Sequence, residues 1–336
     1  MYSSLKPTLP IPPADVLKRF NVHEPMDTRF RACARLLQAV WRERRSLPIG
    51  SYARSEMGTT QLGSRLAATP ARAGLNYLTA DIARQVRREL AYRERGALID
   101  EARAWENLLS SSALTFNLLA PLKLNPTLAK AVLKAVLSID IKAVQAVYFE
   151  TSPGRGDNAY IGDHTALDAL IIYIGKDGKR GFIGVEVKYA ESSPTNATPV
   201  KPRMMELAQR SGIFVDAANP DLRQPTLRQF FAEHMLCYSM IEQGLFERGQ
   251  FIVIAPTQNH EMAMALGGYA KHLASGHSEI LPFTFVSLEA MTAAICDAGE
   301  PDLARALDER YLDLSPIYDL VDDWTPHSIP VKAAAE

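Results

Sequence analysis

The stretch from Thr165 to Ala190, TALDALIIYIGKDGKRGFIGVEVKYA, constrains the fold more than any other part of the chain. Two apolar runs, Leu167 to Ile174 and Phe182 to Tyr189, flank a polar segment that contains Gly178 and Gly181, which is the pattern of a β-hairpin. Successive strand side chains point to opposite faces, so Glu186 and Lys188 share one face. Charged side chains in strands this apolar cost free energy unless they are paired or bind a metal ion.

The register of this hairpin decides whether Asp168, on the first strand, joins Glu186 and Lys188. A three-residue loop at 177–179 makes Asp168 face Lys188 and puts all three side chains on one face. A loop one residue shorter makes Asp168 face Val187 and moves it to the opposite face. The proximity of the charged residues therefore depends on a single residue of register.

An Asp on one strand followed by Glu-x-Lys on the next resembles the site of the PD-(D/E)XK nuclease superfamily. This resemblance implies that Asp168 and Glu186 bind Mg²⁺, or Mn²⁺ in its place, with the Val187 carbonyl as a further ligand. It also implies that Lys188 orients or activates the attacking water. The Glu-x-Lys part matches in full, whereas Leu167 stands where the superfamily name has Pro, a position at which members vary. The structural alternative is a salt bridge to Lys188 on a solvated strand face.

The resemblance suggests further residues for the site. A helix before the first strand often adds an acidic residue in such folds, and Glu106 in the predicted helix 100–119 matches by position. Glu150, at the end of the predicted strand 142–150, is an alternative that replaces or supplements it. Gln229 lies where relatives place Gln or Lys in the helix after Glu-x-Lys. Glu106 and Gln229 also have ordinary structural interpretations, as a solvated helix Glu and a surface helix-forming Gln.

The resemblance extends to an uncharacterised bacterial, restriction-endonuclease-like branch of this superfamily and covers roughly residues 90 to 256. Its blocks are Tyr92 to Leu122, Phe149 to Pro153, Asp163 to Glu191 and Gln229 to Leu236. The branch implies an α/β fold in which helices flank a mixed central β-sheet that carries a metal site. It implies no particular substrate.

The chain is 336 residues long and 47% hydrophobic, which suffices for one large domain or two small ones. Residues 47–60 contain Pro48, Gly50 and Gly58 and are predicted to form a loop. The predicted division is an Arg-rich, mainly helical N-terminal region (1–99), a nuclease-like domain (100–300), and a C-terminal extension with a tail (301–336). The expected strands are 142–150, 167–174, 182–189, 250–255 and 283–286.

Charge is distributed unevenly, although the formal net charge is only −1. Residues 1–100 hold 17 Lys plus Arg against 9 Asp plus Glu, whereas the remainder holds 20 against 29. Arg87 and Arg88, in the predicted helix 76–95, are candidates for phosphate contacts, as is Arg155 in a Gly-rich loop. The asymmetry fits an electrostatic contact between two parts of one protein equally well, and charge alone does not separate these interpretations.

Composition excludes several other classes. No run of about 18 apolar residues occurs and the N-terminus lacks the pattern of a secretory signal, so neither membrane insertion nor export is expected. Three widely spaced Cys residues without a Cys-x-x-Cys pair predict a reduced, cytoplasmic protein. The sequence has no Gly-Lys-Ser/Thr phosphate loop, no His-Glu-x-x-His and no Gly-x-Ser-x-Gly.

The residues and the resemblance together favour a Mg²⁺-dependent nuclease that hydrolyses phosphodiester bonds in nucleic acid, with DNA as the expected substrate. A catalytically silent nucleic-acid-binding or scaffold protein on the same fold is the alternative. The complete set of Asp168, Glu186 and Lys188 favours the enzyme, because a silent member would be free to lose Lys188. The sequence leaves open DNA against RNA, the specificity of cleavage, and whether the chain forms a homodimer.

Overall fold

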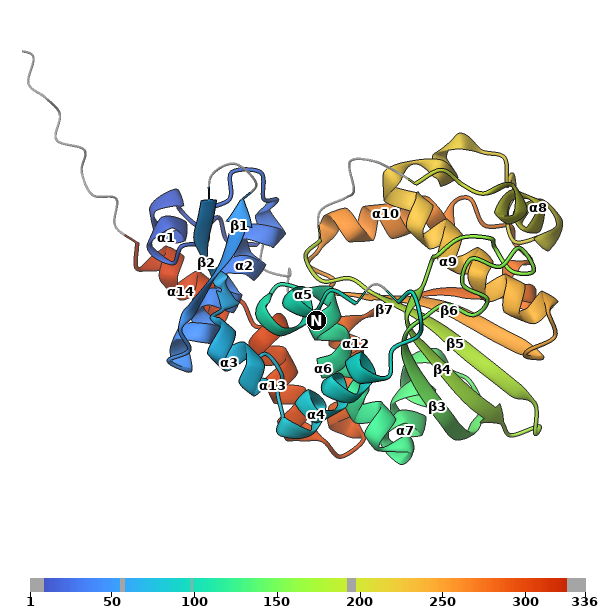
Figure 1. Ribbon diagram of the computed structural model, residues 1–336, viewed down its shortest axis with the longest axis horizontal. Helices are drawn as coiled ribbons and strands as arrows, with labels where there is room; N and C mark the ends of the chain where they lie inside the picture. The colour runs from blue at the N-terminus through green and yellow to red at the C-terminus, as the bar shows by residue number, and fades with distance from the viewer. Residues whose placement is uncertain (1–8, 55–57, 98, 192–197, 325–336) are drawn as a thin grey trace, which may run out of the picture.

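The computed structural model describes residues 9–54, 58–97, 99–191 and 198–324. Its centre is a five-stranded sheet in the order β3-β4-β5-β6-β7 (Figure 1). β4 is antiparallel to both of its neighbours, β3 and β5, and β5, β6 and β7 are parallel. The mixed sheet flanked by helices confirms the predicted fold class. The strands are β3 (Ile141–Thr151), β4 (Leu167–Gly175), β5 (Arg180–Val187), β6 (Arg248–Ala255) and β7 (Phe283–Ser287).

Helices cover both faces of the sheet (Figure 1), so its central strands β4, β5 and β6 are buried on both sides. On β4, Ala169 and Ile171 belong to one core, and Leu170 and Ile172 belong to the other. The first core lies under α6 (Ser111–Leu124), α7 (Pro126–Leu137) and α12 (Leu288–Asp297). The second lies under α8 (Pro202–Ser211), α9 (Pro225–Glu242) and α10 (His260–Ala270), with η1 (Pro220–Arg223) and α11 (His277–Ile280) nearby in the chain.

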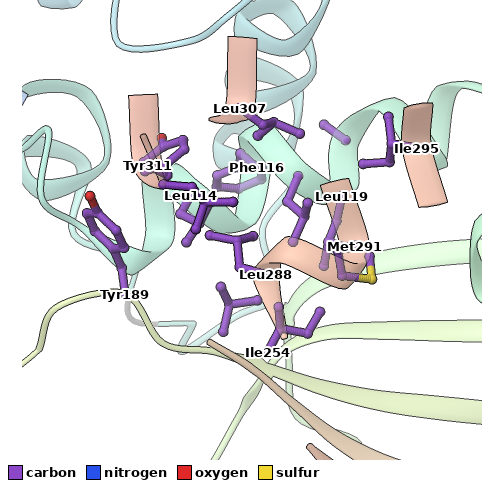
Figure 2. Close-up of a cluster of buried hydrophobic side chains, with 14 of the residues drawn as sticks. Leu114, Phe116, Leu119, Tyr189, Ile254, Leu288, Met291, Ile295, Leu307 and Tyr311 are labelled. Carbon is purple, nitrogen blue, oxygen red and sulfur yellow. The ribbon is translucent and has the colours of Figure 1, made fainter. Parts of the chain in front are cut away.

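The first core joins segments that are far apart in the sequence. Figure 2 shows Leu114 and Phe116 of α6 beside Leu288 of α12 and Leu307 of α13. Burying each such side chain contributes roughly 1.5–3 kcal/mol relative to leaving it exposed. The C-terminal extension therefore contributes to the core through α13 (Pro301–Tyr311) and α14 (Ser315–Asp322). Its predicted tail, residues 326–336, lies outside the described residues.

The N-terminal region contains a β-hairpin where the sequence analysis predicted a loop. Gly50 pairs with Leu62 just after a bulge, and a Cβ at Gly50 would lie 2.1 Å from the Leu66 carbonyl oxygen. The glycine therefore permits a close strand approach and does not interrupt the strand, which is why the prediction was wrong. The elements of this region are α1 (Ala14–Arg19), α2 (Arg29–Arg44), β1 (Ile49–Arg54), β2 (Gly58–Leu66), α3 (Ala68–Ala73) and α4 (Ala80–Ala91), and α5 (Glu101–Glu106) follows it.

Buried contacts connect the N-terminal region to the rest of the chain. Arg310 of α13 is fully buried, stacks 4.3 Å from the Trp41 ring of α2 and donates hydrogen bonds to Asn76. One hydrophobic core includes residues from all three predicted segments. The predicted domain boundaries at residues 99 and 300 stay predictions. No helix within the described ranges is long and apolar enough to cross a membrane.

Candidate active site

Three acidic side chains lie in one row across the neighbouring strands β3, β4 and β5. Ala169 pairs with Val185, so Asp168 lies opposite Glu186. The β3–β4 register likewise places Glu150 opposite Asp168. All three line one cavity of about 360 Å³, which residues of both α9 and α6 also line.

The loop of the β4–β5 hairpin covers residues 176–178, one position earlier than the 177–179 loop that the favourable register assumed. It still has three residues, and Gly178 comes last with φ 82°, where a left-handed residue closes such loops. Moving the loop by one position shifts the pairing by two residues. Asp168 therefore faces Glu186, which corrects the predicted pairing but leaves the charged side chains on the same face.

Lys188 is held at one end of the row by two acceptors. Its Nζ lies 2.6 Å from Glu186 Oε1 and 2.8 Å from Gln229 Oε1. Burial disfavours the ammonium ion, but the carboxylates of Glu186 and Glu233 outweigh it and raise the pKa of Lys188 above its ordinary value. Lys188 is therefore a fixed cation beside the row of carboxylates.

Asp168 hydrogen-bonds to the neighbouring strand, and its pKa is perturbed by the other charges in the row. Its Oδ2 accepts a hydrogen bond of 2.8 Å from the Val187 N–H, so it continues the pairing of β4 with β5. Burial raises the pKa of Asp168 well above its usual range, and the neighbouring charge of Glu186 raises it further. Buried carboxylates that repel each other are suited to bind a hard divalent cation. Such a cation takes oxygen ligands and neutralises the negative charges of the carboxylates.

The acidic residues are not arranged as a preformed metal cage. No group of three or more His, Cys, Asp or Glu side chains in the described parts of the chain has the geometry to hold a metal ion. Glu186 is engaged by Lys188 and Gln229, and Asp168 by the Val187 N–H. What the site offers is a set of oxygen donors on adjacent strands.

The structure does not bring Glu106 to this row. Glu106 lies at the end of α5, pairs with Arg65 at 3.1 Å and lines a different cavity beside Trp105. The predicted helix 100–119 is in fact two helices, because the chain turns between them. Asn107 Oδ1 accepts from the Leu109 N–H, and a Ser caps α6. The sequence placed Glu106 on one continuous helix. Because the chain turns directly after Glu106, its side chain lies away from the row of carboxylates.

Glu150 lies where Glu106 was expected to act. It lines the same cavity as Asp168, and its pKa is raised first by burial and then by the charge of Glu186. Its backbone has φ 45°, in the left-handed region that a non-glycine residue rarely adopts. Such a conformation costs roughly 1–3 kcal/mol and persists only where the surroundings impose it.

Two acidic residues near the row were missed by the sequence analysis. Glu233 lies one helical turn after Gln229 on α9 and is 1% exposed. Glu191 accepts hydrogen bonds from the N–H groups of Ser111 and Tyr189, and although burial opposes it, the charge of Lys188 lowers the pKa of Glu191. A Glu within the apolar pattern of α9, four residues after Gln229, was the available signal for Glu233.

The arginines proposed for phosphate contacts lie outside the cavity. Arg155 pairs with Glu94 at 3.1 Å and donates to the Glu150 carbonyl at 3.3 Å, so it supports the loop that follows β3. Arg87 stacks 5.3 Å from the Trp105 ring, and Arg88 is exposed on α4. Their contact with nucleic acid stays a prediction.

A mixed five-stranded sheet that carries Asp and Glu-x-Lys on adjacent strands, with helices on both faces, defines a restriction-endonuclease-like nuclease fold. A family model described as PD-(D/E)XK nuclease superfamily matches residues 25–313, and the chain therefore belongs to this superfamily. This confirms the resemblance, and the match includes α2 and α13 as well as the sheet. Searches of curated proteins and of solved structures gave no match.

Proposed function

We propose that this protein is a Mg²⁺-dependent nuclease that hydrolyses phosphodiester bonds in nucleic acid, with DNA as the expected substrate and Mn²⁺ as an alternative metal. One observation carries the proposal: Glu150, Asp168 and Glu186 form a row that Lys188 completes, inside a cavity. The membership of the chain in a nuclease superfamily supports the same reaction, since nucleases of this superfamily generally use divalent metal ions.

The oxygen donors of the row would hold the metal. Asp168 and Glu186 would be its carboxylate ligands, the Val187 carbonyl would add a main-chain oxygen, and Glu150 would take the place first assigned to Glu106. A bound Mg²⁺ would supply Lewis-acid activation of water and neutralise charge on the scissile phosphate.

The side chains around the donors would position the reacting groups. The Lys188 ammonium would orient the water and stabilise negative charge that develops on the phosphate. Gln229, which contacts both Lys188 and Glu186, would keep that cation in place. Asp168 would also hold the end of β5 through the Val187 N–H, so the Glu-x-Lys segment keeps its position when substrate enters.

Glu150→Gln and Glu106→Gln form a matched pair that tests this assignment. Both changes preserve side-chain size and remove one negative charge. We expect Glu150→Gln to lower the cleavage rate about 10- to 100-fold, as loss of a supporting metal-site group does, and Glu106→Gln to retain the wild-type rate. Single-turnover cleavage with Mg²⁺ measures both variants, with thermal unfolding as a check on the fold. The opposite order of effects would assign the supporting acidic residue as Glu106 and not Glu150.

The nuclease proposal itself is tested with purified protein, Mg²⁺ or Mn²⁺, and single-stranded, duplex and branched DNA and RNA. We expect metal-dependent cleavage of at least one DNA substrate that chelation abolishes. Binding without cleavage on every substrate would support the silent scaffold in place of the enzyme.

A further inference from the structure

The side-chain amide of Gln229 lies between two carboxylates and an ammonium group. Its Nε2 is 2.7 Å from Glu186 Oε1 and 2.7 Å from Glu233 Oε1, while its Oε1 is 2.8 Å from Lys188 Nζ. Carboxylate oxygens accept hydrogen bonds and an ammonium group donates them. Only one orientation of the amide satisfies all three contacts, and in this orientation both N–H groups of Gln229 are used.

Glu233 supplies the second acceptor from outside the catalytic cavity. It is 1% exposed and lines a separate cavity on the other side of Gln229, beside Asp163 and Arg228. Its hydrogen bond to the site therefore runs through Gln229, and its charge also acts on Lys188. Among the described residues, Glu233 Oε2 has no hydrogen-bond partner. A buried carboxyl group with an unsatisfied oxygen costs free energy, which an apolar residue at this position of α9 would avoid.

Without an acceptor at Glu233, one N–H of the half-buried Gln229 would lose its protein partner. The Gln229 side chain would then gain by rotating away toward another acceptor, and its Oε1 would leave the Lys188 ammonium. Lys188 would retain the Glu186 carboxylate as its partner and lose the contact that fixes its direction along the row. An effect at Glu233 would thus reach the reacting atoms through two hydrogen bonds.

We propose that Glu233 is a positioning residue of the nuclease site, which locks the Gln229 amide across Glu186 and Lys188 by accepting its second N–H. The inference rests on the proposed function and adds a residue to it. The requirement is for a correctly placed acceptor oxygen, which a neutral group also supplies.

Three substitutions separate an acceptor from a charge. Glu233→Met removes the acceptor at similar size. Glu233→Asp keeps the carboxyl group but withdraws it from Gln229 by one carbon. Glu233→Gln keeps a carbonyl oxygen in place without the charge. We expect the Met and Asp variants to lower kcat about 10- to 100-fold with little change in KM, as loss of a supporting group does, and the Gln variant to recover most of that loss.

A double substitution tests whether Glu233 acts through Gln229. If it does, Gln229→Met combined with Glu233→Met should be no slower than Gln229→Met alone, because the second change removes a contact already lost. Additive losses in the double variant would mean that Glu233 acts by another route, and the proposal would be wrong.

A second measurement needs no enzymatic activity. Lys188 has a side chain that is 13% exposed, whereas that of Lys176, in the hairpin loop, is 62% exposed and serves as the internal reference. Acetylation of the native protein, followed by mass spectrometry, gives the labelling rate at each lysine. Relative to Lys176, we expect faster labelling of Lys188 in Glu233→Met and Glu233→Asp, and a rate close to wild type in Glu233→Gln.

The two measurements decide the inference independently. Unchanged labelling of Lys188 in folded Glu233→Met, or equal impairment of the Gln and Met variants in kcat and labelling, would overturn it. Thermal unfolding identifies variants that fail to fold, and the Asp variant replaces the Met variant if the latter does. A wild-type protein that is inert on every substrate would contradict the proposed nuclease, and the labelling rates would still test the role of Glu233.

Discussion

Replacing Lys188 by Ala is expected to abolish cleavage while leaving nucleic-acid binding nearly intact. Lys188 lies 2.6 Å from Glu186 at the end of the carboxylate row, where its ammonium group can reach an attacking water. Removal of one group that stabilises the transition state typically costs about 10²-fold or more in rate, whereas one phosphate contact among many changes affinity modestly. Single-turnover cleavage and equilibrium binding, measured on the same substrate, separate the two effects.

Arg88→Ala is the matched control for Lys188→Ala, because both changes remove one positive charge. Arg88 is exposed on α4, outside the catalytic cavity. We expect weaker binding with a smaller salt dependence and an unchanged rate at saturating substrate. If wild type and Lys188→Ala both bind and are equally inert, the scaffold alternative is correct. If both cleave equally, the activity comes from residues other than those assigned.

Millimolar Mg²⁺ or Mn²⁺ is expected to raise the unfolding temperature of the wild-type protein, and Asp168→Asn is expected to remove most of that shift. A ligand that binds only the folded state stabilises it by about 2.7 kcal/mol at a concentration 100 times its Kd. Asn keeps an acceptor for the Val187 N–H but loses the charge that would hold the metal. Thermal unfolding with and without metal is the measurement. An equal shift in both proteins would exclude Asp168 as a ligand.

Asp168→Asn should also be more stable than wild type at neutral pH without metal. Burial and Glu186 raise the pKa of Asp168, so the folded protein binds this proton more tightly than the unfolded chain does. This tighter proton binding stabilises the folded protein fully below the ordinary carboxyl pKa. The stabilisation is lost as the pH rises through the raised pKa of Asp168. The advantage of the Asn variant should therefore shrink in acid. A constant difference between the two proteins across pH would contradict this account.

Much of the fold could be predicted because its signals are local. The apolar runs that became β4, β5 and β6 are continuous in the sequence, and the glycines between the first two indicated a hairpin. The hairpin β1–β2 was missed because Gly50 was interpreted as a turn residue, whereas it lets two strands approach closely. The break at Asn107 was missed because a capping side chain acts only once the backbone has turned.

The sequence by itself determined that Glu186 and Lys188 share a face, since residues two apart on a strand always do. It also indicated the nuclease superfamily, because Asp, hairpin and Glu-x-Lys follow one another along the chain. Only the tertiary structure decided that Asp168 faces Glu186, that Glu150 and not Glu106 lies in their row, and that Glu233 accepts a hydrogen bond from Gln229. These relations join separate strands and a helix, and their distances depend on register and packing, which no spacing within one segment specifies.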